Sequence, residues 1–421
     1  MAGEPGFLIL SHQLMSMVGP LATALSRRGI KTYVLASKPT RDVDSGWRSE
    51  VETLYITDAH ALHSSDIDLF LKELSAADVN LLGCVTVWDA YRELMAYANQ
   101  QIGTADLSEE GVRLLRDKLA MRECLREAGL SEVTAWPLEE DRYLSLQDRT
   151  RYFIKPREGL ASLGAFRADR LGEFGELDTL WEGAQGDSAY AGVFTGRRSF
   201  ILEEFIDGIE CSFEVSVLEG ESTVHAVHEK IDLQQSGRTT LENACVCPPR
   251  SLDPGEVGAG IAYVRRCLRA LGVTTGVYHA EARFQRGRGW ELVEANPRIG
   301  GACIVPSTRR HSGVDLLERW LDLLLGQAAP SDGPGQSTDR STFFRVFFGE
   351  PGRQIARLDR RPGRIEALEE KIFVKEGEHL PLVDREIFIG QALWDITSLN
   401  PDVLEDFFHE TESHLKVEYR P

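Results

Sequence analysis

Val277-Tyr-His-Ala-Glu-Ala-Arg-Phe284 and Glu291-Leu-Val-Glu-Ala-Asn-Pro-Arg298 have the composition of two paired β-strands, rich in Val, Leu, Tyr and Phe. The link between them, Arg286-Gly-Arg-Gly289, places Gly287 where a two-residue type II′ turn requires a positive φ. These segments therefore predict a β-hairpin with a defined register.

Two acidic residues of this hairpin are expected to face each other. If Arg286 pairs with Gly289, Glu281 lies opposite Glu294, and Asn296 shares their face because side chains alternate along a strand. Opposed carboxylates repel, and a divalent cation would remove the conflict. Mg²⁺ takes hard oxygen ligands and leaves positions for nucleotide phosphates. We therefore predict a site for Mg²⁺ or Mn²⁺, with two exposed acids on a solvated face as the alternative.

Composition limits the classes of partner. The chain has 421 residues, enough for two or three domains, and 42% hydrophobic content. Its 47 Lys and Arg against 66 Asp and Glu give a net charge of −19. Because nucleic acids and anionic membranes bind basic surfaces, this balance argues against both. An anionic substrate would need a locally basic pocket.

The sequence also suggests a compartment. Met1-Ala-Gly-Glu-Pro5 lacks the pattern of a signal peptide, and the chain has no apolar run of about 20 residues. The seven cysteines are scattered without a Cys-x-x-Cys pair. We expect reduced thiols and a cytoplasmic protein.

The first hundred residues alternate apolar strands with amphipathic helices, the pattern of a parallel α/β sheet. The expected elements are strands 7–10, 32–36 and 81–87 and helices 16–28 and 90–100. No Gly-x-Gly-x-x-Gly is present, which argues against a dinucleotide site. Ser11 and His12 follow the first strand at the end where such sheets bind ligands, although a core or loop role is favoured for them.

The middle and end of the chain show mixed elements. We expect a helix over 109–128, strands over 152–155, 199–205 and 212–218, a linker over 329–337, and beyond it strands 343–348 and 386–390 with a closing helix 401–409.

Lys155 ends a strand and precedes a small-residue loop bounded by Gly159 and Gly164. Glycines let backbone N–H groups approach phosphate oxygens, and the lysine adds a positive charge. Ser162 lies within this loop. Taken alone, a surface turn explains the loop equally well.

Ile201-Leu-Glu-Glu-Phe-Ile-Asp-Gly-Ile-Glu210 reads as a strand that ends in a glycine turn. Backbone groups of Glu204 and Ile206 could match the hydrogen-bonding edge of adenine, and Glu210 could accept from ribose hydroxyls. An ordinary charged hairpin is the alternative. Lys118, on a predicted helix, has a solvated helix face as its alternative.

Together these motifs, in this order, resemble the ATP-grasp superfamily over roughly residues 107–326. The resemblance implies ATP and Mg²⁺ (or Mn²⁺) as cofactors, bound between two α+β subdomains. It implies nucleotide-binding roles for Lys118, Lys155, Ser162, Glu203, Glu204, Ile206 and Glu210, metal-binding roles for Glu281, Glu294 and Asn296, and catalytic roles for Arg298, Gly300 and Gly301.

Within the superfamily, three features most resemble bacterial L-amino acid ligases: His279-x-Glu281, the Asn296-Pro-Arg-Ile-Gly-Gly301 ending, and Leu241-Glu-Asn-Ala-Cys-Val-Cys-Pro-Pro249. The resemblance implies substrate contacts by Glu242 and His279. Comparable ligases carry a Glu and a His near positions 242 and 245, and this chain has Cys245 at the second. The acceptor or donor substrate therefore stays open.

We accordingly expect an α/β and α+β chain with an ATP-grasp fold. Its expected parts are an N-terminal parallel α/β (pre-ATP-grasp) domain 1–106, an ATP-grasp domain 107–330 with a lid near 150–208, and a small C-terminal α+β module 331–421. The expected enzyme is an ATP-dependent carboxylate–amine ligase that forms an amide or peptide bond through an acyl phosphate and releases ADP and phosphate. A biotin- or purine-type carboxylase and a non-catalytic ATP-binding regulatory module are the alternatives.

The resemblance also defines the expected partners. They are small-molecule carboxylate and amine substrates. The net charge argues against nucleic acid and membrane as partners, and a homodimer is the candidate assembly.

Overall fold

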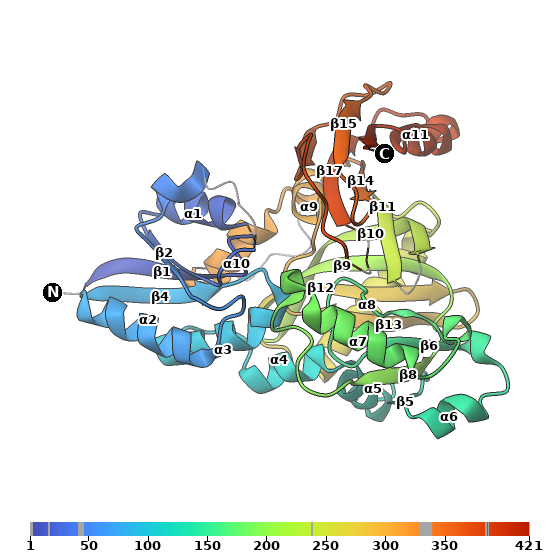
Figure 1. Ribbon diagram of the computed structural model, residues 1–421, viewed down its shortest axis with the longest axis horizontal. Helices are drawn as coiled ribbons and strands as arrows, with labels where there is room; N and C mark the ends of the chain where they lie inside the picture. Colours follow the sequence, from blue (N-terminus) through green and yellow to red (C-terminus); the bar gives the residue numbers. More distant parts are fainter. Residues whose placement is uncertain are drawn as a thin grey trace.

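The computed structural model describes residues 3–15, 17–40, 46–236, 239–327, 339–383, 385 and 387–420. Side chains of 234–241 are also left aside. The predicted linker 329–337 lies outside the described residues, as do the first residue of the predicted helix at 16 and of the predicted strand at 386. An N-terminal α/β unit lies beside a long central sheet (Figure 1). A second four-stranded sheet covers one side of this central sheet (Figure 1).

The N-terminal unit is built on a parallel sheet of order β3-β2-β1-β4. Its elements are β1 (Glu4–Ser11), α1 (Val18–Arg27), β2 (Lys31–Ala36), η1 (Gly46–Glu50), β3 (Thr53–Ile56), α2 (Ser64–Ala76), β4 (Val79–Val85), η2 (Asp89–Tyr91) and α3 (Arg92–Ile102). The apolar runs of β1 and β2 are almost completely buried, as continuous apolar strands covered on both faces must be. The predicted parallel α/β sheet is therefore confirmed.

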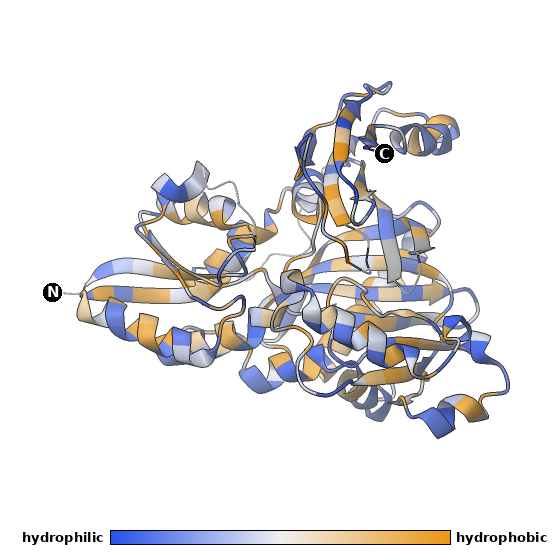
Figure 2. Cartoon of the chain, in the orientation of Figure 1, coloured by the Kyte–Doolittle hydropathy of each residue, from blue (hydrophilic) through white to orange (hydrophobic). Residues whose placement is uncertain are grey.

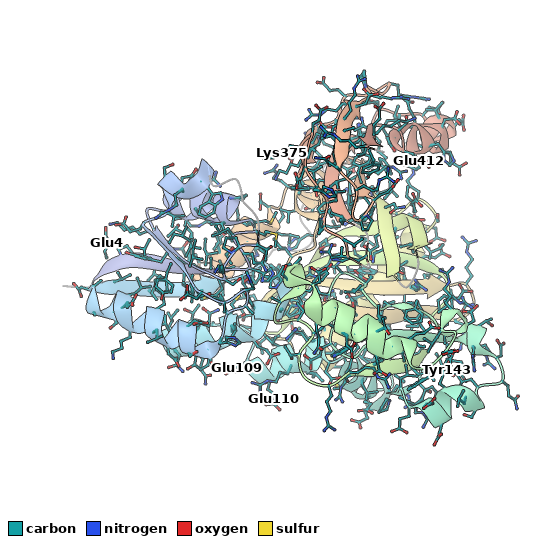
Figure 3. The ribbon with its side chains drawn as sticks, viewed as in Figure 1. Glu4, Glu109, Glu110, Tyr143, Lys375 and Glu412 are labelled. Atoms are coloured by element: carbon teal, nitrogen blue, oxygen red, sulfur yellow. The ribbon has the colours of Figure 1, made fainter. Side chains whose placement is uncertain are left out.

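Two helices follow where the sequence predicted one: α4 (Glu109–Arg116) and α5 (Lys118–Glu127). Glu109 and Glu110 stand in the first turn of α4 (Figure 3). The break occurs at Asp117, whose carboxylate accepts from the backbone N–H groups of Leu119 and Ala120 as an N-cap. The single predicted helix is wrong for this local reason, and Lys118 becomes the first residue of α5.

A separate small sheet of order β5-β8-β6-β7 begins before the predicted lid 150–208 and includes most of its strands, and the role of a lid stays a prediction. Its elements are β5 (Ala135–Pro137), α6 (Glu140–Ser145), η3 (Arg149–Arg151), β6 (Tyr152–Pro156), β7 (Phe166–Arg167), η4 (Ala168–Arg170), α7 (Glu176–Gly186), η5 (Ser188–Tyr190) and β8 (Phe200–Glu204). Tyr143, labelled in Figure 3, is buried in its core and donates to the carbonyl of Leu171 at 2.5 Å. This small sheet has an apolar core of its own.

The central sheet has the order β13-β12-β9-β10-β11-β14-β17-β16. Its elements and the helices packed on it are β9 (Ile209–Leu218), β10 (Glu221–Ser236), β11 (Thr239–Cys247), α8 (Pro254–Ala270), β12 (Gly276–Gln285), β13 (Gly289–Asn296), α9 (Ile304–Ser312), α10 (Leu316–Leu324), β14 (Thr342–Gly349), β16 (Glu369–Ile372) and β17 (Ile387–Asp395). Strands β9, β12 and β13 alternate hydrophobic and hydrophilic residues (Figure 2).

The C-terminal strands continue the central sheet, because β14 pairs with β11. The remaining elements are β15 (Ile355–Arg360), η6 (Pro401–Val403), α11 (Leu404–Thr411) and β18 (Leu415–Tyr419), with β15 and β18 paired as a two-stranded sheet. The division into three domains stays a prediction. Among the described residues, no helix combines the length and apolarity needed to cross a membrane.

Candidate functional site

The β12–β13 hairpin brings Glu281 opposite Glu294, as predicted, but its loop length and its strand register differ from the prediction. Gln285 pairs with Gly289, so the loop has three residues and the predicted two-residue turn is wrong. Gly287 does have a positive φ of 87°. A bulge at Val293 adds one residue to β13, and it cancels the shift that the longer loop causes.

Oxygen ligands gather on the cleft-facing side of this hairpin. The side-chain amide of Asn296 donates to Glu294 Oε1 at 2.7 Å, which holds both side chains together. Lys118 Nζ lies 3.7 Å from Glu294 Oε2. Two carboxylates and an amide oxygen form the donor set that Mg²⁺ prefers, so these residues fit such an ion.

His279 lies behind Glu281 and does not line the cleft. Its Nδ1 is 2.8 Å from Glu214 Oε1, and its Nε2 is 3.0 Å from Glu281 Oε1. Burial would lower the pKa of His279, but Glu214 and Glu281 outweigh it and raise the pKa to about 10. With both ring nitrogens on carboxylates, the predicted substrate contact by His279 is not supported by this geometry.

Lys230 forms the centre of a buried ionic cluster that the sequence reading missed. Its Nζ lies 2.7 Å from Glu210 Oε1 and 2.9 Å from Glu281 Oε2, and it also bonds to Glu242. Oxygens of the three carboxylates lie within 4.8 Å of one another. Burial would lower the pKa of Lys230, but the three carboxylates raise it well above its usual value. The ammonium therefore supplies the countercharge that this cluster needs.

Glu242 differs from its neighbours in the cluster, because its side chain remains 36% exposed. Burial raises the pKa of Glu242 to about 7, although the nearby Lys230 acts in the opposite direction. The pKa of Glu281 is lowered, because Lys230 and His279 outweigh the effect of burial. All three carboxylates line the cleft, and Glu242 is the most exposed of them.

Lys155 and Glu203 belong to a second buried network. Lys155 Nζ lies 2.7 Å from Glu203 Oε2, while Arg122 Nε lies 2.9 Å from Glu203 Oε1. Arg122 is fully buried and also reaches Glu291 at 2.5 Å. Burial lowers the pKa of Lys155, whereas Lys155 and Arg122 lower the pKa of Glu203 against the effect of burial. The Glu203 carboxylate therefore fixes the two cations.

The predicted adenine strand continues past the end of β8. The backbone N–H of Glu204 donates to the carbonyl of Thr134 at 2.9 Å, so this N–H is not free to bind adenine. The carbonyl of Ile206 accepts from Arg283 at 2.5 Å, and Arg283 also bonds to Glu210 at 2.6 Å. Arg283 thus ties this strand to the cluster around Lys230.

The predicted phosphate loop lines the same cleft as these residues. Ala161 and Ser162 both have a φ of 55°, in the left-handed region that non-glycine residues seldom adopt. Gly164 has a φ of 74°. Residues held in such conformations concentrate at ligand sites, so this geometry fits a binding loop.

Arg298 lines the cleft, with its Nε 3.6 Å from Asp89 Oδ1 and its Nη1 donating to the carbonyl of Ile299 at 3.0 Å. Gly300 lies against His279, since a Cβ built at this glycine would come within 2.7 Å of the His279 Nδ1. A Cβ at Gly301 would meet nothing within 4 Å.

One cleft of about 870 Å³, open to solvent, collects most of the predicted residues. Those that line it are Lys118, Lys155, Ser162, Glu203, Ile206, Glu210, Glu242, Glu281, Glu294, Asn296 and Arg298. Glu204, His279, Gly300 and Gly301 are outside its lining. His12 lies elsewhere: it is buried and stacked on Trp88, and its Nε2 is 2.9 Å from the carbonyl of Ala189.

Sequence reading missed the cations and acids that organise the predicted residues: Arg122, Lys230, Arg283, Asp89 and Glu214. Lys230 and Glu214 interrupt strands that are otherwise buried, and a charge in a buried strand is the one local signal that could have found them. The carboxylates that bind Lys230 and the histidine that binds Glu214 are 12 to 65 residues away in sequence, so the pairing itself has no local signal.

Comparisons with known proteins give the same assignment of the fold. Residues 149–306 match the sequence profile of the ATP-grasp domain. The chain is 24% identical to human carnosine synthase 1 over 61% of its own length and 32% of that protein. It is 24% identical to the alanine–anticapsin ligase of Bacillus amyloliquefaciens over 63% of its own length and 59% of that protein. It thus spans less than two thirds of the length of these relatives.

Solved structures resemble the chain over nearly all of its length. The L-amino acid ligase from Bacillus licheniformis superposes with a TM-score of 0.81 at 17% identity, covering 100% of both chains. The biotin carboxylase from Campylobacter jejuni superposes with a TM-score of 0.68 at 14% identity, covering 98% of this chain and 92% of that chain. The expected fold and the resemblance to L-amino acid ligases are confirmed.

Proposed function

We propose that this ATP-grasp protein is an ATP-dependent carboxylate–amine ligase that joins small amino-acid-like molecules. The observation that carries the proposal is the cleft itself. On one side it presents the oxygen ligands of Glu281, Glu294 and Asn296, and around them it places the cations Lys118 and Lys155. Such a site can bind nucleotide phosphates with their metal ion and hold a second anion nearby.

ATP would lie along the lid. The carbonyl of Glu204 and the N–H of Ile206 would receive the edge of adenine, and Glu210 would accept from a ribose hydroxyl. Lys118 and Lys155 would neutralise phosphate oxygens. Ser162 lies in the loop whose residues Ala161, Ser162 and Gly164 have positive φ angles, and it would cover the phosphates.

Mg²⁺ or Mn²⁺ would be held by Glu281, Glu294 and Asn296. When bound, the ion supplies positive charge to the β- and γ-phosphates and lowers the repulsion between them and an attacking anion. His279 would keep Glu281 in one orientation through the 3.0 Å contact between them. We therefore assign His279 to the support of the metal site in place of a substrate contact.

The reaction would have two steps. A substrate carboxylate oxygen attacks the γ-phosphorus of ATP, ADP leaves, and an acyl phosphate results. An amine then attacks the acyl carbon, phosphate leaves, and the amine loses a proton as the amide forms. Arg298 and the backbone N–H groups at Gly300 and Gly301 would stabilise the oxyanion. Closure of the loop between Gly159 and Gly164 would keep water from hydrolysing the acyl phosphate.

Glu242 would select the substrates. Its carboxylate is open to the cleft and would attract the ammonium group of an amino acid. The residue at 245 is a buried cysteine, so no imidazolium at this position competes with that ammonium for the Glu242 carboxylate. We propose a small carboxylate and a small amine as the substrates. As expected from the sequence, we also propose that the protein is cytoplasmic and forms a homodimer.

A carboxylase would share the fold and the ATP site. The structural likeness to both a ligase and a biotin carboxylase shows the fold alone, and a regulatory nucleotide-binding module would share it too. The reaction that the protein catalyses must therefore distinguish a ligase from a carboxylase or a regulatory module.

A measurement of ADP release distinguishes the ligase, the carboxylase and the regulatory module. Purified protein with MgATP is given single amino acids, pairs of amino acids, or bicarbonate, and both ADP and the condensed product are measured. A ligase releases ADP in proportion to an amide product that contains both substrates. ADP release that depends on bicarbonate would support the carboxylase instead, and ATP binding without turnover in any mixture would support the regulatory module.

A further inference from the structure

The segment Asp89–Arg92 connects the N-terminal sheet to the cleft. It follows β4 and forms η2 and the first residue of α3. Two of its side chains, one helical turn apart, reach the Asn296-Pro297-Arg298 sequence that ends β13. The N-terminal unit thereby contacts residues of the proposed catalytic site.

Arg92 fixes the backbone at this point. Its Nε donates to the carbonyl of Pro297 at 2.6 Å, and its two amino groups bind the Asp106 carboxylate at 3.1 and 3.0 Å. The side chain is 1% exposed and stacks over Trp320 at 5.8 Å. A buried guanidinium held on three sides has little freedom, so the position of Pro297 is well defined.

Asp89 faces Arg298, the residue that follows Pro297. Its side chain is 5% exposed, and Oδ1 lies 3.6 Å from Arg298 Nε without accepting a hydrogen bond in the described structure. Oδ2 lies 3.3 Å from Arg116 Nε. A buried carboxylate oxygen without a hydrogen bond is costly unless a nearby charge offsets it, and Arg298 is the cation that faces Oδ1.

We propose that Asp89 is a positioning residue that holds Arg298 in its working orientation, with Arg92 fixing the backbone beside it. The role of Arg298 rests on the proposed function. Arg298 has its Nε toward Asp89 and Nη1 on the Ile299 carbonyl, so the side chain is held at two points while it lines the cleft. The N-terminal unit is then a working part of the active site, because it supplies the residue that orients the group for the oxyanion.

A purely structural role for Asp89 is the competing explanation, since it also contacts Arg116. Arg116 has other acidic partners, however: Glu93 at 2.8 Å and Glu158 at 4.0 Å. Glu93 therefore offers a matched control, because Glu93→Gln removes a carboxylate from Arg116 without touching Arg298.

The test compares Asp89→Asn with Glu93→Gln in the ligase assay. Asp89→Asn should lower kcat roughly ten- to hundredfold, as displacement of a catalytic group by about 1 Å can do, with KM for ATP changed less than about threefold. Glu93→Gln should leave both within about threefold. In an Arg298→Lys background, Asp89→Asn should have little further effect, because the two residues act as a unit.

A second measurement does not depend on turnover. The side-chain ¹⁵Nε–H resonance of Arg298, identified as the one that Arg298→Lys removes, should shift or broaden in Asp89→Asn and stay in place in Glu93→Gln. An unchanged kcat, effects that multiply fully in the double variant, or an unchanged resonance would each overturn the proposal. If the wild-type protein joins no substrate pair, the proposed function fails, and the resonance alone decides whether Asp89 positions Arg298.

Discussion

Glu281 and Glu294 face each other across β12 and β13, and each carboxylate lies beside a lysine: Lys230 at 2.9 Å from Glu281 and Lys118 at 3.7 Å from Glu294. Glu281 is also bonded to His279. Glu281 is thus neutralised within the protein, whereas Glu294 is 25% exposed and has the weaker contact. The two carboxylates should therefore respond differently to substitution.

Glu294→Gln should lower turnover more than tenfold and leave the fold intact. The substitution removes one charge of the proposed metal site but also one of two facing carboxylates, so the free energy of unfolding should stay the same or rise. Turnover with MgATP and the midpoint of urea unfolding would be measured, with the exposed Glu221→Gln as the control. A loss below tenfold, about 1.4 kcal/mol, would remove Glu294 from the metal site.

Lys155→Ala should weaken ATP binding and slow phosphoryl transfer, whereas Lys38→Ala should do neither. Lys155 is buried in the cleft beside Glu203, and Lys38 is exposed in the N-terminal unit. Glu203 keeps Arg122 as its partner in the variant, so the fold should survive. Nucleotide affinity and single-turnover rates would be compared, and equal effects from the two substitutions would rule out a phosphate role for Lys155.

The hairpin illustrates how far the sequence determines this site. Composition and Gly287 were sufficient to predict two strands and a turn, because these depend on neighbouring residues. The facing of Glu281 and Glu294 was predicted correctly only because the longer loop and the bulge at Val293 cancel. Neither departure has a local sequence signal, since pleat and twist over the whole sheet determine where a bulge forms.

Apart from the helix break at Asp117, the parts of the site that the sequence did not predict depend on long-range pairing. Asp117 breaks the predicted helix through a local cap, which the sequence could have revealed. The pairing of Lys230 with Glu210 and Glu281, or of Arg122 with Glu203, follows only once the strand order is known. The residues proposed to bind ATP could therefore be selected from motifs, and the residues that hold them in place could not.

Buried histidines should give the free energy of unfolding a maximum near neutral pH. Burial lowers the pKa of His12, His225 and His228 to about 4, from an ordinary value of 6.5. Between pH 6.5 and 4 the unfolded chain therefore binds more protons, and stability falls as the pH drops. His279 has the opposite sign: its pKa of about 10 means that its contribution is complete below pH 6.5 and is lost as the pH rises toward 10.

Denaturant unfolding measured from pH 4 to 10 would check this profile. His12→Phe should keep an aromatic ring on Trp88 and flatten the acid limb by up to roughly 3 kcal/mol. The exposed His409→Gln serves as the control for loss of a histidine. An acid limb of the same slope in wild type and His12→Phe would contradict the assignment.

Gly300→Ala should be destabilising, whereas Gly301→Ala should not. The new Cβ at 300 would lie 2.7 Å from both His279 Nδ1 and Ile304 Cγ2, and that at 301 would meet nothing within 4 Å. Overpacking of this kind costs about 1 to 3 kcal/mol. Thermal unfolding of the two variants gives a direct comparison, and equal melting temperatures would mean that His279 can move aside freely.

Glu242→Gln should raise KM for one amino-acid substrate and leave KM for ATP unchanged. Glu242 is open to the cleft, and a charge-assisted hydrogen bond to an ammonium group contributes about 1.5 to 3 kcal/mol, which corresponds to at least a tenfold change in affinity.

Because burial raises the pKa of Glu242 to about 7, the carboxylate forms as the pH rises through 7. In the wild-type protein, KM for the ammonium-bearing substrate should therefore fall between pH 6 and 8, and Glu242→Gln should abolish that pH dependence. KM for ATP and for each amino acid, measured across this range in wild type, Glu242→Gln and the exposed control Glu221→Gln, would identify the substrate that Glu242 holds. A substrate KM with the same pH dependence in wild type and Glu242→Gln would place the ammonium group elsewhere in the cleft.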